Sequence, residues 1–409
     1  MAIKEIELDN FKSLEKAHLE LGIITVVIGA NGTGKSSILQ AVGLIKQSRQ
    51  QRDFVWNGLE VTSGGFTDVV SFGSTKRQVR FGLTIEAPLP EFLSSGSPSR
   101  YVCKYSFSID NFAAVRQEAQ YNWPGQTIAG SFDWKTNRGT VSPNKLSDDV
   151  RLGYPGAIIG SVLYVDPSGP RQDLFKAAMG MGSVVIDSLE RTYSVPIDRG
   201  LTKAAYEQKM APADFRVPED VANFLVYKQD ARERVSKWVS KVLGEELEID
   251  FHRLESGELS IEILRAKESI NVAHEGAGLQ NLLWPLAQLA VAPESALIMV
   301  EEPEIHLHPM AQATLSDVLT TVAKEEGKQL LITTQSEHLL LGFLTKVAEK
   351  GLEPDELSVY YCEKVGPSSQ AVRLKVSSDG TVEGGLRGFF EVNFDEMARY
   401  LEAQQRETS

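Results

Sequence analysis

Apolar residues follow two kinds of spacing near the start of the chain, and each spacing predicts a different element. The alternating residues of the first stretch predict a strand that ends near Phe11. The run from Ile23 to Ile28 is unbroken and β-branched, as expected for a strand buried on both faces. After a glycine-rich turn, apolar residues recur at helical spacing, namely Ile38, Leu39, Val42 and Ile45. A buried strand, a tight turn and an amphipathic helix therefore follow one another.

The spacing changes twice further along the chain. Alternating runs separated by turn residues predict a strand-rich section from about residue 60 to 165. The stretch from Gln172 to about Leu243 is predicted to be mainly helical, and a hairpin follows between Leu247 and Ile263. Apolar strands at Leu297–Val300 and Leu330–Thr334 then alternate with helices, which is typical of a parallel α/β sheet.

These patterns predict an α/β fold with four parts along the chain. The parts are an amino-terminal piece of the core (1–60), a strand-rich antiparallel section (61–165), a helical lobe (166–245) and a carboxyl-terminal piece of the core (246–409). No internal repeat, low-complexity segment or sustained heptad pattern is present in the sequence.

Composition indicates an ordinary globular chain. The 409 residues are 42% hydrophobic and 24% charged, and no apolar run is long enough to span a membrane. The charged amino terminus and the two isolated cysteines, Cys103 and Cys362, favour a reducing cytoplasm. A net charge of −13 argues against a surface that binds nucleic acid throughout. Two small basic clusters keep that alternative open, although a solvated surface is the preferred explanation: Lys46, Arg49 and Arg52, and Lys76, Arg77 and Arg80.

The glycine-rich turn fits the phosphate-loop pattern G-x-x-x-x-G-K-[ST] at every fixed position. Its glycines let successive backbone N–H groups converge on phosphate oxygens, and the following helix directs its positive end toward them. An ordinary strand–helix turn would explain the glycines but not the Lys35–Ser36 pair. A nucleotide is the predicted ligand, and Mg²⁺ the predicted metal, with Ser36 as one of its ligands. The predicted nucleotide-binding residues are Gly29, Asn31, Gly32, Thr33, Gly34, Lys35, Ser36 and Ser37.

Paired acids follow the strand at Leu297–Val300. Such a strand delivers both side chains to the carboxyl edge of a parallel sheet, where ligands bind. Glu301 is predicted to hold Mg²⁺, and Glu302 to accept a proton from the attacking water. A solvent-exposed acidic turn is the simpler alternative. His306 and His308 suggest a metal site, but no third ligand of suitable spacing is evident, so positioning or packing is preferred.

Three blocks together resemble the ABC-type ATPases with SMC-like heads. The blocks GANGTGKS, EEPEIHLHP and LITTQSEHLL are most similar to the AAA-type ATPases of prokaryotic defence operons and to the ATPase part of the overcoming-lysogenization-defect (OLD) nucleases. The opening IKEIELDNFKSLEKAHLEL and the late GFFEVNFDEMARYL are also similar to that group. The resemblance implies a P-loop NTPase with an ABC-type head, in which Glu301 is the Walker B acid and Glu302 the catalytic glutamate. The segment from Glu304 to Pro309 would contact a partner subunit.

The resemblance also implies a second glycine-rich segment that reaches a partner's γ-phosphate. Gly276 and Gly278 open an apolar helix and are the candidates, although no serine precedes Gly276 and a tight turn would also explain them. The family usually has histidine where this chain has Gln335, which donates a hydrogen bond but cannot become cationic. Lys35, Glu302 and Gln335 are therefore the predicted catalytic residues of a slow ATPase. Substitution by His338 is the less favoured alternative, since on a helix it would face elsewhere.

Several features narrow the choice of function. The chain has no zinc-hook CxxC or long coiled coil, and about 75 residues after Gln335 leave little room for a nuclease domain. We expect a homodimer or higher homo-oligomer whose nucleotide state controls a partner effector, such as a nuclease in antiviral defence. The alternatives are a scaffold that binds ATP with little turnover, a DNA-handling ATPase and, least favoured, a transporter ATPase.

Overall fold

A computed structural model gives the structure of the chain. It describes residues 1–49, 54–71, 73–75, 77–88, 100–110, 113–123, 126–133, 138–143, 184–210, 212–266, 268–385 and 399. The strand-rich section is predicted to continue to about residue 165, but its residues after 143 lie outside the described residues. The GFFEVNFDEMARYL block also lies outside them, apart from Arg399.

A large mixed sheet of 13 strands joins most of the described chain, in the order β8-β7-β6-β5-β4-β1-β2-β16-β15-β3-β14-β13-β9. Its strands are β1 (Ala2–Phe11), β2 (Leu14–Glu20), β3 (Ile24–Gly29), β4 (Val79–Pro88), β5 (Arg100–Asp110), β6 (Ala113–Trp123), β7 (Gln126–Asp133), β8 (Arg138–Pro143), β9 (Thr192–Val195), β13 (Leu297–Glu301), β14 (Gln329–Thr334), β15 (Leu357–Val365) and β16 (Ser368–Leu374).

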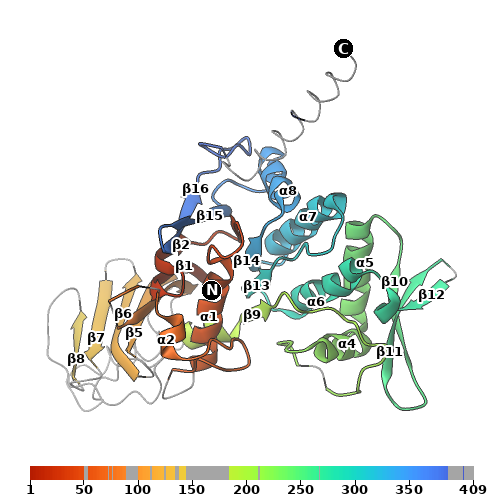
Figure 1. Ribbon diagram of the computed structural model, residues 1–409, viewed down its shortest axis with the longest axis horizontal. Helices are drawn as coiled ribbons and strands as arrows, with labels where there is room; N and C mark the ends of the chain where they lie inside the picture. Colours follow the sequence, from red (N-terminus) through yellow and green to blue (C-terminus); the bar gives the residue numbers. More distant parts are fainter. Residues whose placement is uncertain are drawn as a thin grey trace.

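The sheet has a parallel half and an antiparallel half. Strands β15, β3, β14, β13 and β9 pair in parallel, with β3 between β14 and β15. Strands β1, β2 and β4–β8 pair antiparallel and form the strand-rich section at the left of Figure 1. The predicted fold class, α/β with a strand-rich antiparallel section and a helical lobe, is confirmed.

Helices cover the parallel half, and a small sheet lies beyond them at the right of Figure 1. The helices are α1 (Lys35–Ser48), α2 (Phe66–Val69), α4 (Pro218–Tyr227), α5 (Gln229–Leu243), the 3₁₀ turn η2 (Val272–His274), α6 (Ala277–Val291), α7 (Pro309–Glu325) and α8 (Glu337–Ala348), and residues 184–190 are also helical. The small sheet contains β10 (Glu248–Arg253), β11 (Leu259–Arg265) and β12 (Glu268–Asn271). Strands β10 and β11 form the predicted hairpin.

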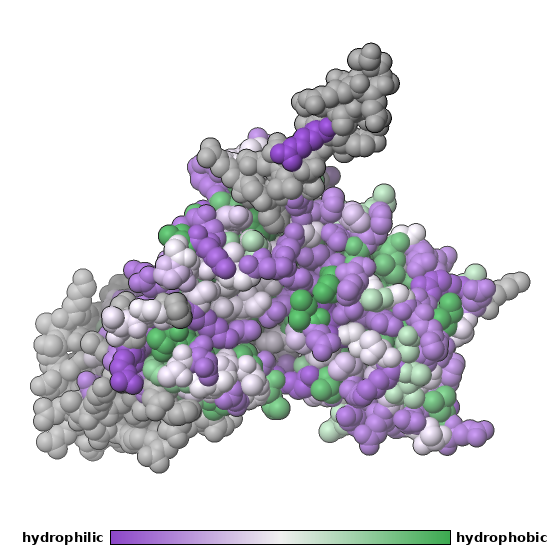
Figure 2. All heavy atoms as spheres, in the orientation of Figure 1, coloured by the Kyte–Doolittle hydropathy of each residue, from purple (hydrophilic) through white to green (hydrophobic). Residues whose placement is uncertain are grey.

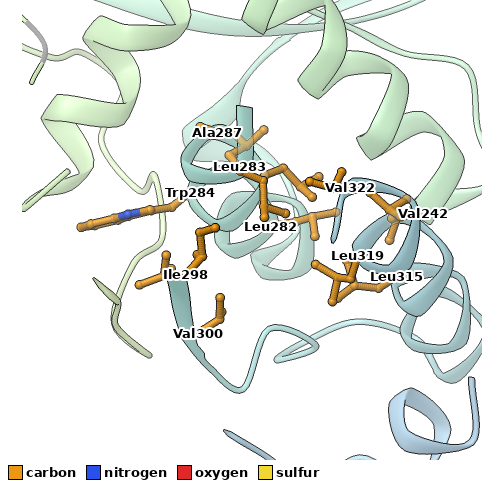
Figure 3. Packing of buried hydrophobic residues seen from close by; sticks show 14 of the residues in the cluster. Val242, Leu282, Leu283, Trp284, Ala287, Ile298, Val300, Leu315, Leu319 and Val322 are labelled. Carbon is orange, nitrogen blue, oxygen red and sulfur yellow. The ribbon is translucent and has the colours of Figure 1, made fainter. Parts of the chain in front are cut away.

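Each face of the parallel half is buried, which explains the continuous apolar runs of its strands. Along β13, Ile298 and Val300 join one hydrophobic cluster, whereas Leu297 and Met299 join the cluster on the opposite face. The first cluster includes residues of α5, α6 and α7; the second includes α1 and β1. Figure 3 shows how α6 side chains pack between β13 and α7 in the first cluster.

The stretch from Gln172 to about Leu243 is predicted to be mainly helical, and its described part contains a helix at 184–190, α4 and α5. It also supplies the short strand β9, which was not predicted and which pairs with β13 at the edge of the large sheet. The polar Thr192 and Ser194 shorten the apolar run of β9, so four residues carry too little periodicity to predict a strand. The fourfold division of the chain remains a prediction.

The surface carries hydrophobic residues in small groups. On the face in Figure 2, green groups of hydrophobic residues are separated by purple hydrophilic ones. The most exposed large hydrophobic side chains of the described residues include Met210, Leu59 and Met310. In the described residues, no helix combines the length and apolar character needed to cross a membrane.

Candidate functional site

The phosphate loop connects β3 to α1 and needs glycine for two different reasons. Gly32 and Gly34 have φ angles of 74° and 94°, in the left-handed region that favours glycine. At Gly29 the constraint is also the neighbouring strand, because a Cβ there would lie 2.3 Å from the Cys362 carbonyl oxygen of β15. Glycine is therefore required in this loop both by the backbone conformation of the loop and by the close approach of β15.

Lys35 lies inside the phosphate loop, at the first residue of α1. Its Nζ donates hydrogen bonds to the carbonyl oxygens of Gly29 at 2.7 Å and Ala30 at 3.0 Å. Burial lowers the pKa of Lys35, while the negative charges of Glu302 and Glu304 act in the opposite direction. The Lys35 ammonium therefore lies beside the backbone carbonyl groups of the loop and near the carboxylates of Glu302 and Glu304. Thr33, Gly34 and Ser37 complete the turn, whereas Asn31 is exposed on it.

Ser36 and Glu301 meet although they lie far apart in the sequence. The Ser36 hydroxyl donates to Oε2 of Glu301 at 3.2 Å. The contact arises because β13 is separated from β3 only by β14, so the carboxyl end of β13 faces the start of α1. Burial raises the pKa of Glu301, helped by the charge of Glu302 and opposed by the Ser36 hydrogen bond.

Glu302 and Gln335 also lie together. Gln335 Nε2 donates a short hydrogen bond to Oε1 of Glu302. The Glu302 backbone has a φ of 43°, and its N–H donates to the Thr333 carbonyl oxygen of β14 at 2.8 Å. A positive φ at a residue other than glycine is uncommon and often marks a functional position. The structure therefore brings together two of the predicted catalytic side chains.

Glu304 is a buried acid that the sequence reading did not single out as a site residue. The Thr334 hydroxyl donates to one of its carboxylate oxygens, and the other has no hydrogen-bond partner in the described residues. Burial raises the pKa of Glu304. From the sequence, Glu304 is expected only in the segment that would contact a partner subunit. A sequence does not show which of several neighbouring acids is buried, so this position could not be predicted.

Gly276 and Gly278 begin α6 and differ in their surroundings. A Cβ on Gly278 would lie 2.7 Å from the His306 carbonyl oxygen, whereas a Cβ on Gly276 would meet no atom of the described residues within 4 Å. Close packing against the loop that follows the acids therefore explains Gly278. It does not explain Gly276, whose φ of −62° any residue can adopt. The contacts of the described residues place Gly278 beside His306 rather than beside the phosphate loop.

This difference gives a test of the second glycine-rich segment. We expect Gly278→Ala to lower the free energy of unfolding by about 1–3 kcal/mol, as overpacking does. Gly276→Ala should change stability by less than about 0.5 kcal/mol, as at other open surface positions. Thermal unfolding of both variants, followed by ATPase assays, checks this expectation. A Gly276→Ala protein that is stable and fully active would show that this position does not require glycine, whereas a stable but less active one would show that a Cβ here obstructs the site.

The two histidines after the acids contact neighbouring backbone at the starts of α7 and α6. Nδ1 of His308 accepts the Met310 N–H at the start of α7, and the carbonyl of His306 lies near Gly278. Within the described residues, neither histidine belongs to a group of three side chains that could hold a metal. His338 is exposed on α8, and Ser336, at the amino end of that helix, accepts the Leu339 N–H.

Two lysines near the phosphate loop were missed. Nζ of Lys12 donates to Oε1 of Gln40 at 2.6 Å, and burial lowers the Lys12 pKa while Glu301 opposes the shift. The exposed Lys364, near the end of β15, has its Nζ 3.8 Å from the position of a Cβ on Gly32. Lys12 is separated from the loop by a turn, and Lys364 lies far from the loop in sequence. The spacing of residues along the chain therefore does not show that either lysine is near the loop.

A cavity of about 770 Å³ opens next to the phosphate loop. It adjoins the loop because Ser13, in its wall, lies 2.5 Å from where a Cβ on Gly34 would be. Its volume is in the range of pockets that bind small organic ligands. Its lining includes Lys12, Ser13, Phe66, Asp68, Arg77 and Pro367.

Lys46 of the first basic cluster is buried, whereas Arg77 and Arg80 of the second cluster are exposed, as expected for a solvated surface. Lys46 is 1% exposed, and its Nζ contacts Glu60 at 2.8 Å and Asp214 at 2.6 Å. Arg80 of the second cluster contacts Glu118. Arg52 and Lys76 lie outside the described residues. Lys46 therefore stabilises the junction between α1 and the segment before α4, and it is unavailable to nucleic acid.

A phosphate loop after a central parallel strand, facing two strand-end acids, is the arrangement of a P-loop protein. Residues 1–87 and 202–340, more than half of the chain, match the AAA ATPase domain family, so the chain belongs to this family. The OLD nuclease of Thermus scotoductus (strain ATCC 700910 / SA-01) is 21% identical over 349 residues, which cover 82% of this chain. The chain spans 59% of that relative's length. The resemblance stated from the motifs is thereby confirmed.

Solved structures of SMC heads are similar at low sequence identity. The SMC head domain from Thermotoga maritima is 14% identical, with a TM-score of 0.43, and the match covers 92% of this chain and all of that one. The Smc head domain with an extended coiled coil, bound to the C-terminal domain of ScpA from Pyrococcus furiosus, is 12% identical with a TM-score of 0.46. That match covers 99% of each chain.

Proposed function

We propose that this chain binds Mg-ATP and hydrolyses it to ADP and phosphate. The observation that carries the proposal is the 3.2 Å hydrogen bond from Ser36 to Glu301. It joins the first turn of the phosphate-loop helix to the end of β13, which is where a nucleotide's terminal phosphates and their metal would lie. Membership in the AAA ATPase domain family supports the same activity.

The donors at this position suit magnesium. Mg²⁺ prefers oxygen ligands and is commonly held by one or two carboxylates together with substrate phosphates. The Ser36 hydroxyl and the Glu301 carboxylate provide such oxygens, and they already lie within hydrogen-bond distance of each other. When bound, the ion would neutralise part of the negative charge on the phosphates. Ser36 and Glu301 are therefore the proposed metal ligands.

Each remaining site residue has a proposed role in hydrolysis. Lys35 and the loop N–H groups bind the phosphates, so the ammonium exchanges loop carbonyls for phosphate oxygens. Glu302 accepts a proton from the attacking water, and Gln335 holds the Glu302 carboxylate and donates to the reacting oxygens. Because Gln335 cannot become cationic, we propose that turnover is slow. The adjacent cavity beside Lys12 and Ser13 accommodates the nucleoside.

We further propose that two copies close on ATP and that their nucleotide state controls a partner effector. Gly276 is unconstrained by packing and lies at the start of a helix, where free N–H groups suit a phosphate from a second copy. A nuclease in antiviral defence is the proposed effector, because the curated relative is named an OLD nuclease and extends beyond the matched region. The second candidate is a scaffold with little turnover, which the Gln335 substitution favours.

Lys35→Ala tests nucleotide binding. Loss of a charged hydrogen-bond donor is worth about 1.5–3 kcal/mol, so we expect about 10–10²-fold weaker binding of Mg-ATP. Titration with a fluorescent ATP analogue, beside an assay of phosphate release, checks the result. Lys237→Ala removes an exposed lysine on α5 and serves as the control. Unchanged affinity in Lys35→Ala would overturn the proposed site, and tight binding without phosphate release by the wild type would favour the scaffold.

A further inference from the structure

Arg199 is completely buried and is bound by main-chain carbonyl groups from three segments. Its Nη1 donates to Pro196 at 2.9 Å and Glu301 at 2.6 Å, and its Nη2 donates to Glu302 at 2.7 Å. Its Nε donates to Asn281 on α6 at 3.0 Å. The guanidinium therefore connects the end of β9, the end of β13 and the first turns of α6.

A proline in α6 explains why the Asn281 carbonyl is free to accept from Arg199. Residue 285 would normally donate its N–H to the carbonyl of residue 281, four positions earlier. Pro285 has no N–H, so this helical hydrogen bond is missing. Arg199 Nε supplies the donor instead. A nearby backbone contact, from the Leu201 N–H to the Gln280 carbonyl oxygen at 3.4 Å, holds the two segments together.

On its other side, Arg199 holds the unusual backbone of Glu302. The carbonyl groups of Glu301 and Glu302, which precede and follow the Glu302 Cα along the main chain, both accept from this one guanidinium. A residue other than glycine with positive φ costs about 1–3 kcal/mol and persists only when its surroundings fix it. Arg199 and the N–H contact to Thr333 together provide that fixation. The direction of the Glu302 side chain depends on it.

The chemistry of this cluster requires arginine. A guanidinium has five N–H donors in a rigid plane and can serve four carbonyl groups, whereas a lysine ammonium is a point charge with three. Burial lowers the pKa of Arg199 to about 10, with Glu304, Glu301 and Glu302 opposing the shift, so the group stays charged at neutral pH. Lysine would preserve the charge but not the geometry.

We propose that Arg199 is a positioning residue for hydrolysis, which fixes the Glu302 backbone and ties it to the start of α6. The inference rests on the proposed ATPase function. Arg199 does not contact the nucleotide; it acts through the carboxylate it orients. Because Asn281 lies one turn after Gly278, a movement at the start of α6 reaches Glu302 through a single side chain.

The test compares Arg199→Lys and Arg199→Ala with the wild-type chain. A misplacement of about 1 Å can cost about 10²-fold in rate, so we expect kcat to fall by about that factor in both variants. Affinity for Mg-ATP should stay within about threefold, because the phosphate loop is unchanged. Guanidinium ion at a non-denaturing concentration should restore part of the activity of Arg199→Ala but not of Arg199→Lys. Thermal unfolding identifies variants that fail to fold.

Arg232→Lys is the matched control, since Arg232 also donates to main-chain carbonyls, those of Leu225 and Val226, but away from the site. It should keep wild-type kcat. Folded Arg199 variants with wild-type kcat, or an equal loss in Arg232→Lys, would overturn the inference. Absence of hydrolysis by the wild type would instead overturn the proposed function, so the two failures are distinguishable.

Pro285→Ala provides a second route if the Arg199 variants do not fold. Alanine restores the N–H that competes for the Asn281 carbonyl, and it is a better helix former than proline. A poorer orientation of Glu302 that raises the activation free energy by about 1.4 kcal/mol would lower kcat about tenfold, while the fold stays intact. A folded Pro285→Ala protein with unchanged kcat would count against the link to α6.

Discussion

Glu302→Gln is expected to lower the rate of ATP hydrolysis by about 10²–10⁴-fold, the usual contribution of a general base. The change is isosteric and removes the proton acceptor, while Lys35, Ser36 and the phosphate loop stay in place. Binding of Mg-ATP should therefore persist. Single-turnover measurements of phosphate release, together with binding titrations, separate the two effects.

Glu325→Gln is the control for this variant, because it makes the same change at an exposed position at the end of α7. It should hydrolyse ATP at the wild-type rate. Gel filtration with Mg-ATP adds a second readout: Glu302→Gln should accumulate as a dimer, since closure persists when hydrolysis does not end it. Undiminished hydrolysis would remove Glu302 from its proposed role, and a monomer at every workable concentration would remove the dimer.

Leu283→Ala is expected to cause the largest loss of stability among the substitutions considered. Leu283 is completely buried on α6, beside the β13 and α7 residues shown in Figure 3. Truncating a buried leucine costs about 2–5 kcal/mol through lost transfer free energy and the cavity left behind. This is a large part of the roughly 5–15 kcal/mol that stabilises a typical domain. Urea denaturation measures the difference.

Leu59→Ala makes the same substitution at a side chain that is 85% exposed. Its free energy of unfolding should stay within about 0.5 kcal/mol of the wild type. Equal destabilisation by the two variants would mean that α6 does not pack between β13 and α7 as described. A loss confined to Leu283→Ala supports this packing.

The sequence predicted the parallel core and its acids because their signals are local. Strand β3, the phosphate loop and α1 follow each other without interruption, and Glu301 and Glu302 directly end a four-residue apolar run. Strand order follows less directly from such patterns. Even so, parallel strands place their carboxyl ends at one edge, so the meeting of Ser36 with Glu301 could be expected.

What the sequence could not predict depends on burial and on distant partners. Arg199 stands in the unremarkable stretch SVPIDRG, and nothing there shows that four carbonyl groups surround its side chain. Lys46 was included in a possible surface patch, but it is buried because Glu60 and Asp214 come to it from other segments. The sequence shows which charged side chains are present, whereas only the folded chain shows which of them form ion pairs.

The position of β3 between β14 and β15 has a consequence for protein synthesis. Both neighbours of β3 leave the ribosome about 300 residues after it, and Gly29 pairs with Cys362. Until then, the fully buried strand β3 has two unpaired edges, a condition that favours aggregation. A nascent chain would gain a complete phosphate loop only when β15 arrives. The ability to bind nucleotide could therefore serve as a marker of completed folding.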